Sequence, residues 1–396
     1  MRAREIVVII GGGVYVPALC QALARMASLP PLELRVVSRR SDRAGVIARH
    51  SAARLATLRP DWRVHADVAL DRACEGASAV ILLVRVGGAA ARRHDETFPT
   101  RFGLVGDEGL GPGGFANAWR SFPVLADIAR TIRRHAPAAP VLNLVAPLGM
   151  TTRWCLWHGL DAVGLCELPT LTERRLDPGP WCYAGLNHIG WFWRPSAPAG
   201  EPPPEPICDR QVWDRFGAVP LAYYYRVFDV QAGARIGVSA QPGRAEALAS
   251  LSAYLLSRYA ERPGEQVPED AARPTPWFDE AVAPVLVARF GGAPHQGYAN
   301  VANRGRMPFV PPDVVVEVRA CFSAAETEVP APAPAPAAVS SFLARAATAE
   351  ELAYRAASAR RTDLLAEALC MLPLDVPRTR LDELVELITM PITESP

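Results

Sequence analysis

The chain has 396 residues, half of them hydrophobic, and carries 42 Lys and Arg against 41 Asp and Glu. This length is enough for one large domain or two ordinary ones, each with its own core. A formal net charge of +1 provides no long-range field that could hold a polyanion. We therefore expect neither a nucleic acid nor a membrane as a partner, and small-molecule chemistry is the class of function that remains.

Three further features bear on where the protein works. No apolar run reaches the roughly 18 residues that a membrane span needs. The N-terminus passes from a short apolar run directly into glycines instead of a signal-peptide cleavage site. The eight cysteines are scattered without a CxxC pair, unlike a disulfide framework or a zinc ribbon. We expect a cytoplasmic protein with reduced cysteines.

The first part of the chain alternates between strand and helix patterns. In chain order, these are strand 5–10, helix 17–26, strand 32–38, helix 42–58 and the continuous apolar strands 77–84 and 139–145. Strands that alternate with helices at this spacing imply right-handed crossovers and a parallel sheet. Residues 1–165 are therefore predicted to form one doubly wound α/β domain.

The pattern changes after residue 165, and we expect a second domain over 166–396. Its features are, in chain order, aromatic-rich 181–193, a Pro-rich loop at 196–206, aromatic-rich 223–228, helix 244–259, strand 314–320, Pro-Ala-rich 329–338 and helices within 340–390. The Pro-Ala alternation predicts an extended connector.

A turn of three glycines, Gly11, Gly12 and Gly13, lies between the first strand and the first helix. There the bare backbone can approach a pyrophosphate, and the helix N-terminus can stabilise its charge. A tight turn without a ligand is the alternative, because Val16 stands where the usual fingerprint has its third glycine. The second strand ends in Ser38-Arg39-Arg40 instead of an acid. This ending favours NADP over NAD, unless both arginines simply face solvent.

Residues 85–123 are the segment richest in charges and glycines. We expect a long polar loop there, at the carboxyl edge of the sheet, where doubly wound proteins bind ligands. Its glycine cluster at 111–114 indicates a close approach of the backbone to another group. A charge-rich loop that merely faces solvent is the alternative.

Two further groups of side chains could carry chemistry. Cys166 and His188 offer a thiolate and an imidazole, which can share a divalent first-row metal, although each residue alone is more often structural. Tyr223, Tyr224 and Tyr225 offer phenol groups, with aromatic packing as the alternative.

Nine motifs occur along the chain, and several of them contain the residues described above. They are IIGGG at 9–13, Arg85-Val86-Gly87-Gly88 followed by AR, Asp95-Glu96, the block at 103–114 that ends in GPGG, RSFPV at 120–124, LNL-x-x-P-x-G at 142–149, GLC at 164–166, LNHIGW at 186–191 and N-x-G…P…D-VVVEV at 303–318. Together they resemble glycoside hydrolase family 4, the NAD- and manganese-dependent 6-phospho-glycosidases and related α-glycosidases. The resemblance implies a Rossmann-like domain joined to an α+β domain of the lactate and malate dehydrogenase type.

The resemblance also implies a mechanism. In the family, a nicotinamide oxidises C3 of the sugar, a tyrosine removes the C2 proton, the C1 substituent is eliminated, and a metal polarises the C2 and C3 oxygens. Cys166 and His188 match the metal ligands, and Gly11 to Gly13 match the pyrophosphate turn. Tyr224 is the first choice for the base, with Tyr223 and Tyr225 as alternatives. The remaining matches, to cofactor or substrate contacts, are Arg85, Arg92, Asp95, Glu108, Asn143 and Asn187.

The sequence departs from the family at several of these positions. Ala146 replaces an active-site asparagine, and Glu167 follows the metal cysteine where the family has Asn. Arg262-Pro263-Gly264 is what remains of the R-G-G-x-Y-S stretch, and Val14 and Val16 replace hydroxyl residues of the glycine turn. These changes predict that substrate recognition and cofactor binding differ from those of the family. The two metal ligands are unchanged.

We therefore expect a 6-phospho-β-glucosidase-like enzyme that uses NAD or NADP and Mn²⁺ or another divalent metal on a sugar or sugar phosphate. An NAD(P)-dependent sugar dehydrogenase or epimerase on an unphosphorylated substrate is one alternative. A ligand-binding homologue without turnover is the other. The resemblance further implies a homodimer or homotetramer.

Overall fold

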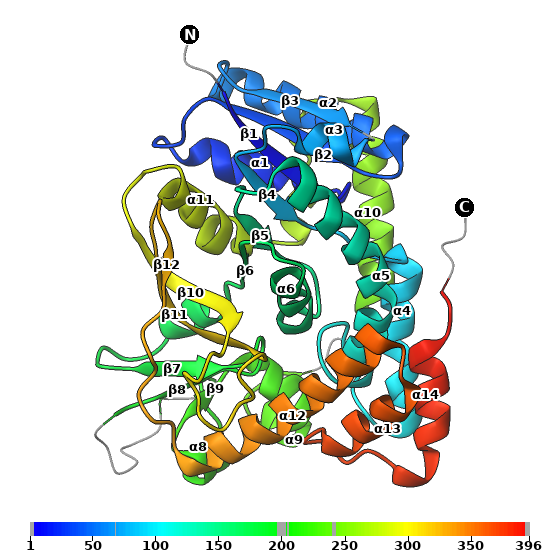
Figure 1. The fold of residues 1–396 in the computed structure, drawn as a ribbon, viewed down its shortest axis with the longest axis vertical. Helices are drawn as coiled ribbons and strands as arrows, with labels where there is room; N and C mark the ends of the chain where they lie inside the picture. The colour runs from blue at the N-terminus through cyan, green and yellow to red at the C-terminus, as the bar shows by residue number, and fades with distance from the viewer. Residues whose placement is uncertain (1–3, 68, 196–202, 204–205, 240–242, 393–396) are drawn as a thin grey trace.

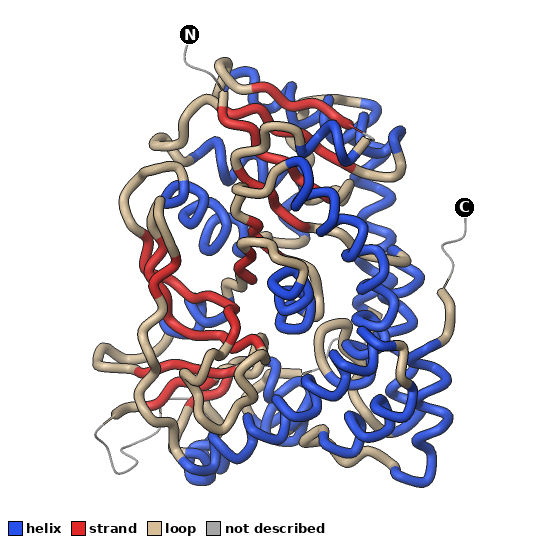
Figure 2. The backbone as a smooth tube through the Cα atoms, in the orientation of Figure 1, coloured by secondary structure: helices blue, strands red, loops and turns tan. Residues whose placement is uncertain are grey.

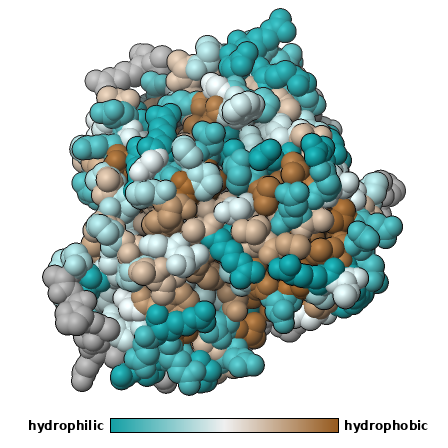
Figure 3. Space-filling model, turned by 60° about the horizontal axis from the view of Figure 1, so that its bottom comes forward, coloured by the Kyte–Doolittle hydropathy of each residue, from teal (hydrophilic) through white to brown (hydrophobic). Residues whose placement is uncertain are grey.

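The structure is a computed structural model that describes residues 4–67, 69–195, 203, 206–239 and 243–392. Within these residues, no helix combines the length and the apolar composition that crossing a bilayer requires. Seen from the end that carries α8 and α12, the surface mixes hydrophilic and hydrophobic side chains (Figure 3).

In the described residues, one sheet of twelve strands runs through the molecule in the order β3-β2-β1-β4-β5-β6-β10-β11-β7-β8-β9, with β12 beside β11 (Figure 1). The pairs from β3 to β6 are parallel, and all later pairs are antiparallel. The strands are β1 (Glu5–Ile10), β2 (Leu32–Val37), β3 (Arg63–Asp67), β4 (Ala79–Leu82), β5 (Val141–Asn143), β6 (Ala162–Gly164), β7 (Cys182–Gly185), β8 (Trp191–Trp193), β9 (Val219–Pro220), β10 (His295–Ala302), β11 (Val315–Phe322) and β12 (Thr327–Glu328).

Helices cover this sheet on both faces (Figure 2). The α-helices are α1 (Val16–Arg25), α2 (Ser41–Leu58), α3 (Leu70–Cys74), α4 (Gly88–Thr97), α5 (Gly111–His135), α6 (Leu148–Trp157), α7 (Leu168–Glu173), α8 (Arg210–Phe216), α9 (Val230–Arg235), α10 (Arg244–Glu261), α11 (Ala283–Arg289), α12 (Ala337–Ala359), α13 (Thr362–Met371) and α14 (Leu381–Thr389). Shorter 3₁₀ or π turns are η1 (Phe98–Phe102), η2 (Tyr224–Phe228), η3 (Pro268–Ala272), η4 (Phe278–Val282) and η5 (Arg378–Arg380).

Strand β1 shows why the sheet needs two helical layers. Val7 and Ile9 share a core with α1, α2 and α11, whereas Val8 and Ile10 share a core with α5 and the C-terminal helices α12 to α14. Successive side chains of a strand point to opposite faces, so a strand that is apolar at every position must be covered twice. The C-terminal helices thus complete the core of the N-terminal sheet.

The predicted strands and helices of residues 5–58 and the buried strands β4 and β5 are confirmed, within a few residues at their ends. The parallel sheet joined to antiparallel strands is the α/β plus α+β architecture expected from the sequence. Strand β3 was missed, because its sequence RVHAD at the sheet edge contains no apolar run.

The expectation of a long polar loop over 85–123 is wrong. Helices α4 and α5 and the turn η1 occupy most of this segment and leave loops only at 85–87 and 103–110. The glycines at the start of α5 pack closely, as predicted, but against the chain's own backbone. A Cβ on Gly114 would lie 2.7 Å from the carbonyl carbon of Gly109. Glycine and proline are poor helix formers, so the residues at the start of α5 gave no prediction of a helix.

Of the two Pro-rich segments, 196–206 lies almost wholly outside the described residues. Residues 329–336 form neither helix nor strand, and α12 begins at Ala337. A division into domains near residue 165 remains a proposal. The parallel strands end with β6 at Gly164, and the pairing of that residue with Asn300 continues the sheet into the second half.

Replacing Gly113 with Ala should destabilise the fold. The new Cβ would lie 2.3 Å from the carbonyl oxygen of Asp95 and 2.4 Å from that of Asp107, so backbone would have to move. Overpacking costs about 1–3 kcal/mol or more, and we expect the free energy of unfolding in urea to fall by at least ~2 kcal/mol. Gly45→Ala is the control, because its Cβ meets only the flexible Arg49 side chain at 3.4 Å. Wild-type stability in both variants would contradict the prediction.

Candidate functional site

One row of residues across the sheet positions the two predicted metal ligands. Gly164 of β6 pairs with Asn300 of β10. Asn300 pairs in turn with Glu317 of β11, which pairs with Gly185 of β7. The loops that follow β6 and β7 carry the predicted cysteine and histidine, so this row fixes where both loops start.

Cys166 and His188 are connected through Asn187. Cys166 is buried, its thiol lies 3.9 Å from Oε2 of Glu167, and it hydrogen-bonds with the Asn187 side chain. His188 is the residue after Asn187. Burial and the carboxylates of Glu167 and Glu317 raise the pKa of the Cys166 thiol well above its usual range. Without a cation, this side chain is therefore a thiol and not a thiolate.

Behind Asn187 lies the fully buried carboxylate of Glu317. It accepts hydrogen bonds from the hydroxyl of Tyr183, from Nδ2 of Asn187 at 3.0 Å and from Nδ2 of Asn300 at 2.8 Å. Burial raises the pKa of Glu317 to about 6. The glycine of the LNHIGW motif makes room for this network, since a Cβ on Gly190 would lie 1.9 Å from the Tyr183 hydroxyl.

His188 has the features of a metal ligand. Its φ of 69° is in the left-handed region, which is uncommon for residues other than glycine. Burial and the charges of Arg244 and Arg226 lower the pKa of His188 to about 3, so the imidazole is neutral. Within the described part of the chain, its buried Nδ1 atom has no hydrogen-bond partner. A neutral imidazole with an unused nitrogen suits a divalent first-row metal.

The donor set is thus one thiol and one imidazole. Across the described residues, no three Cys, His, Asp or Glu side chains gather into a group that could hold a metal ion. Catalytic metal sites keep positions open for substrate or water, and a two-residue set leaves several. Cys166 and His188 therefore fit a metal whose coordination is completed by ligand oxygens.

The three consecutive tyrosines point in different directions. The ring of Tyr223 stacks on His188, with centroids 4.1 Å apart, and its hydroxyl accepts a hydrogen bond from Arg244 at 3.4 Å. Tyr224 packs in an aromatic core, and the hydroxyl of Tyr225 bonds to the backbone just before α8. Successive residues of a helical turn do not share a face. This geometry favours Tyr223 over Tyr224, and the identity of the base stays a proposal.

Predicted contact residues meet in a cluster of arginines and acids. Glu108 pairs with Arg85 and with Arg92 at 3.3 Å, and Arg92 also pairs with Glu96 at 2.6 Å. Burial and the charges of Arg92 and Arg273 lower the pKa of Arg85 to about 9. The cluster is crowded with cations, and Glu108 connects two of them.

Sequence reasoning missed three arginines. Arg226 and Arg244 act on His188, as described above, and Arg273 acts on Arg85 and on Glu167 through its charge. Arg226 packs over the ring of Tyr223, and Arg273 packs over two other aromatic rings. Neither forms an ion pair with a carboxylate of the described residues. For Arg226 and Arg244, the sequence offered no signal.

Arg273 does have a signal in the sequence. Trp277 follows it by four positions, as Tyr follows Arg in the family pattern R-G-G-x-Y-S. The stretch chosen for that pattern, Arg262-Pro263-Gly264, lies just after α10 instead. There the exposed Arg262 pairs with Glu265. Of the two arginines, Arg273 is the one whose charge acts on Arg85 and Glu167, and its place in the site stays a proposal.

Two predicted substrate contacts serve the fold. Asp95 is 1% exposed and forms an ion pair with Arg120 at 2.5 Å. Asn143 is fully buried, and its Nδ2 donates at 3.0 Å to the hydroxyls of Thr151 and Thr152. Both side chains have internal partners, and their predicted role as substrate contacts stays a prediction.

The glycine turn fits a pyrophosphate. A Cβ on Gly12 would lie 2.8 Å from the Ser38 side chain, while Gly13 has open space around its missing Cβ. Helix α1 begins with no side-chain cap and no acid in its first turn, so the positive end of its dipole faces the glycine turn. Of its first amides, the Val16 N–H is already bonded to the Gly13 carbonyl, and Pro17 has none. Arg39 and Arg40 are exposed next to Ser38.

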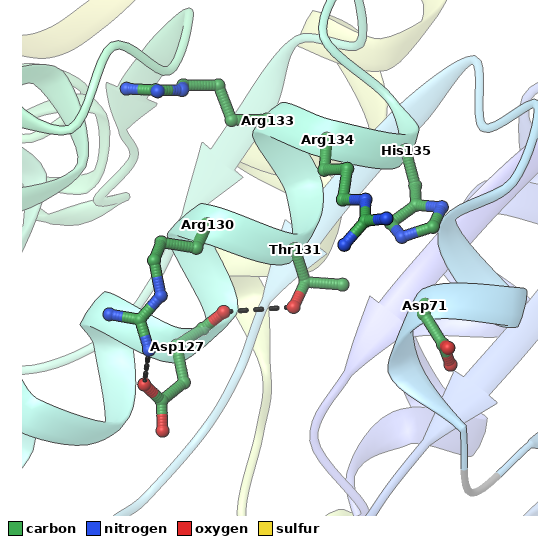
Figure 4. Close-up of a pocket in the computed structure, with 7 residues that line it drawn as sticks. All are labelled: Asp71, Asp127, Arg130, Thr131, Arg133, Arg134 and His135. Atoms are coloured by element: carbon green, nitrogen blue, oxygen red, sulfur yellow. Dashed lines mark hydrogen bonds and ion pairs between the residues drawn. The ribbon is translucent and has the colours of Figure 1, made fainter.

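A separate hollow lies between α3 and the end of α5 (Figure 4). Its lining consists of Asp71, Asp127, Arg130, Thr131, Arg133, Arg134 and His135. The exposed Arg130 pairs with Asp127, and the Arg133 side chain points away from the others (Figure 4). None of the predicted site residues contributes to it, so this hollow is solvated charged surface and not the candidate site.

Comparison with known proteins gives two family matches. The model described as family 4 glycosyl hydrolase matches residues 6–178, and the model of that family's C-terminal domain matches residues 183–374. A probable 6-phospho-beta-glucosidase of Bacillus subtilis (strain 168) is 29% identical over 201 residues, which are 48% of this chain and 46% of that protein. The match spans about half the length of this relative.

Solved structures extend the likeness to the whole fold. The 6-phospho-beta glucosidase from Thermotoga maritima with manganese, NAD⁺ and glucose-6-phosphate has a TM-score of 0.81 at 22% identity, covering 97% of each chain. MGS-M5, a lactate dehydrogenase from a deep-sea metagenome library, has a TM-score of 0.56 at 13% identity, covering 90% of this chain and 100% of that one. They confirm the predicted fold class.

Asp95→Asn should destabilise the protein, because it leaves Arg120 without its buried counter-charge. Breaking a buried ion pair costs about 3–5 kcal/mol, and we expect a loss of that order in the free energy of unfolding in urea. Asp127→Asn is the matched control, on the same helix as Arg120. It disrupts a pair with Arg130 in which both side chains are at least 70% exposed, so stability should change by less than ~1 kcal/mol. Equal losses in the two variants would refute a structural role for Asp95.

Proposed function

The chain belongs to family 4 of the glycosyl hydrolases, and from this premise we propose that it is a 6-phospho-β-glucosidase-like enzyme dependent on NAD and a divalent metal. The observation that carries the proposal is the stack of His188 on Tyr223, beside the loop of Cys166. It supports a site with a neutral imidazole, a thiol and a phenol, which are the groups that the family's chemistry uses.

Cys166 and His188 would hold the metal. When bound, a divalent ion supplies Lewis-acid polarisation of sugar oxygens. The unused, buried Nδ1 of His188 supports the assignment, as does the manganese of the Thermotoga maritima structure. The protein keeps both donors neutral until a cation arrives, so binding is coupled to release of the thiol proton.

Tyr223 would take the C2 proton. Burial and the carboxylate of Asp107 raise the pKa of its phenol, whereas the cations Arg244 and Arg226 lower it. These two arginines would stabilise the phenolate that accepts the proton. The hydrogen bond from Arg244 also fixes the orientation of the Tyr223 oxygen.

Gly11 to Gly13 and the start of α1 would bind the cofactor pyrophosphate. When bound, NAD supplies a reversible hydride acceptor for C3 of the sugar. The NAD⁺ of the Thermotoga maritima structure supports this cofactor. The exposed Arg39 and Arg40 keep NADP as a prediction, since a guanidinium pair suits a 2′-phosphate.

A phosphate group on the substrate would occupy the arginine-rich side of the site. Arg226 and Arg273 have no carboxylate partner in the described residues, and cations held near other cations gain from a bound anion. Glucose-6-phosphate in the neighbouring structure supports this substrate class. A homodimer or homotetramer stays a prediction from the resemblance.

Tyr223→Phe should abolish most exchange of the C2 hydrogen. General bases contribute about 10²–10⁴-fold to rate, so we expect deuterium incorporation at C2 to fall by at least ~100-fold. The measurement is NMR in D₂O with NAD⁺, Mn²⁺ and a 6-phospho-β-glucoside. Tyr224→Phe and Tyr225→Phe are the controls and should keep the exchange, because their hydroxyls lie away from the stack. Loss in Tyr224→Phe alone would sink the assignment of Tyr223.

The same assay separates the candidate functions. Cleavage without net NADH supports the proposed hydrolase, and accumulation of NADH without cleavage would replace it with a dehydrogenase. Absence of both exchange and cofactor binding would favour a ligand-binding homologue. The unphosphorylated glucoside, run in parallel, tests whether the phosphate is needed.

Replacing Arg39 and Arg40 together with Ala should leave NAD⁺ binding unchanged. Any NADP⁺ binding should weaken, because the two exposed guanidinium groups are lost. A ligand at a hundredfold excess over its Kd raises stability by about 2.7 kcal/mol, so thermal-shift titrations with each nucleotide will resolve the difference. If the binding of NAD⁺ and of NADP⁺ weakened equally, the two arginines would not distinguish the nucleotides by their 2′ group.

A further inference from the structure

We propose that Glu317 is a positioning residue of the metal site: its buried carboxylate holds the loop of Asn187 and His188 toward Cys166 and neutralises the bound cation. The inference rests on the proposed function, because it assigns a role toward the metal that Cys166 and His188 would bind.

The position of Glu317 in the sheet is the first step. It stands in the row that joins β6 to β7, between Asn300 on one side and Gly185 on the other. Asn187 follows β7 and contacts both the Glu317 carboxylate and the Cys166 thiol. The carboxylate therefore lies one side chain behind the two donors, where outer partners orient metal ligands.

The charge of Glu317 is the second step. The side chain is fully buried, and its three hydrogen-bond donors, Tyr183, Asn187 and Asn300, are all neutral. No Arg, Lys or His among the described residues forms an ion pair with it. A buried carboxylate without a counter-charge is costly. The protein thus keeps an anion in its interior whose compensating cation is not part of the described chain.

A divalent cation at the adjacent pair would balance this charge. Bound by the thiolate of Cys166 and the neutral imidazole of His188, it would keep one positive charge, which the Glu317 carboxylate neutralises. The same carboxylate holds the Asn187 amide, so one group would serve both the charge and the geometry of the site.

A neighbouring carboxylate shows the contrasting arrangement. Glu173 accepts a hydrogen bond from the Tyr298 hydroxyl at 2.7 Å and pairs with Arg319. Tyr298 and Arg319 are paired residues of β10 and β11, two positions along from Asn300 and Glu317. Glu173 thus receives a tyrosine hydrogen bond at the same two strands but has its cation within the protein, which makes it a matched control.

The test measures Mn²⁺ binding to the full-length protein without substrate, by EPR titration of free Mn²⁺. In Glu317→Gln, the amide oxygen can still accept from both asparagines. The hydrogen bond with Tyr183 has to reverse, because the amide nitrogen donates to the Tyr183 oxygen instead of accepting from its hydroxyl. The variant thus removes the charge and keeps the shape of the side chain. We expect the Kd for Mn²⁺ to rise by about 10–100-fold, with NAD⁺ affinity unchanged. The melting temperature of the metal-free variant should be equal to that of wild type or higher. Glu173→Gln should bind Mn²⁺ as wild type does.

Four results would overturn the inference. Wild-type Mn²⁺ affinity in Glu317→Gln would show that the charge does not act on the metal. A lowered melting temperature of metal-free Glu317→Gln would indicate a purely structural role. If Mn²⁺ binding weakened equally in Glu173→Gln, the effect would be a general one of removing a negative charge. Failure of the wild-type protein to bind Mn²⁺ would instead overturn the proposed metal dependence and this inference with it.

Discussion

The pairing of Gly164 with Asn300 is the constraint on which the rest of the structure depends. It joins the parallel strands to the antiparallel strands as a single sheet. Only glycine fits there, since a Cβ on Gly164 would lie 2.5 Å from the Thr152 hydroxyl and 2.8 Å from the Asn300 Cβ. This close contact brings the loops after β6 and β7, with their thiol and imidazole, to one place.

The charges around these two loops shift the pKa values of the two donors in opposite directions. Carboxylates beside Cys166 raise the pKa of its thiol, and arginines beside His188 lower the pKa of its imidazole. Burial is the larger cause in both cases and shifts each pKa in the same direction as these neighbouring charges do, because it disfavours whichever form of the side chain is charged. The free protein therefore holds two neutral donors, a state that a cation can convert by displacing one proton.

The sequence predicted what depends on local pattern and failed where packing decides. Apolar runs located β1, β2, β4 and β5, whereas α5 was hidden because its first turn is built from glycines that must touch other backbone. The tyrosine triplet was located as a group, but its orientation depends on the turn η2, so Tyr223 could not be singled out. Glu317 was read only as part of an apolar strand, because no pattern shows that its partners are neutral.

Two of the departures from the family, at Ala146 and Glu167, lie in the loops that follow β5 and β6. Glu167 follows Cys166 directly and interacts with the charge of Arg273, whereas Glu317 faces the strands behind the loops. A carboxylate at 167 and a methyl group at Ala146 would change what a ligand contacts, and neither residue is a member of the paired row Gly164, Asn300, Glu317 and Gly185. Under the proposed function, changes at these two positions would alter what a substrate contacts without changing the sheet that positions Cys166 and His188.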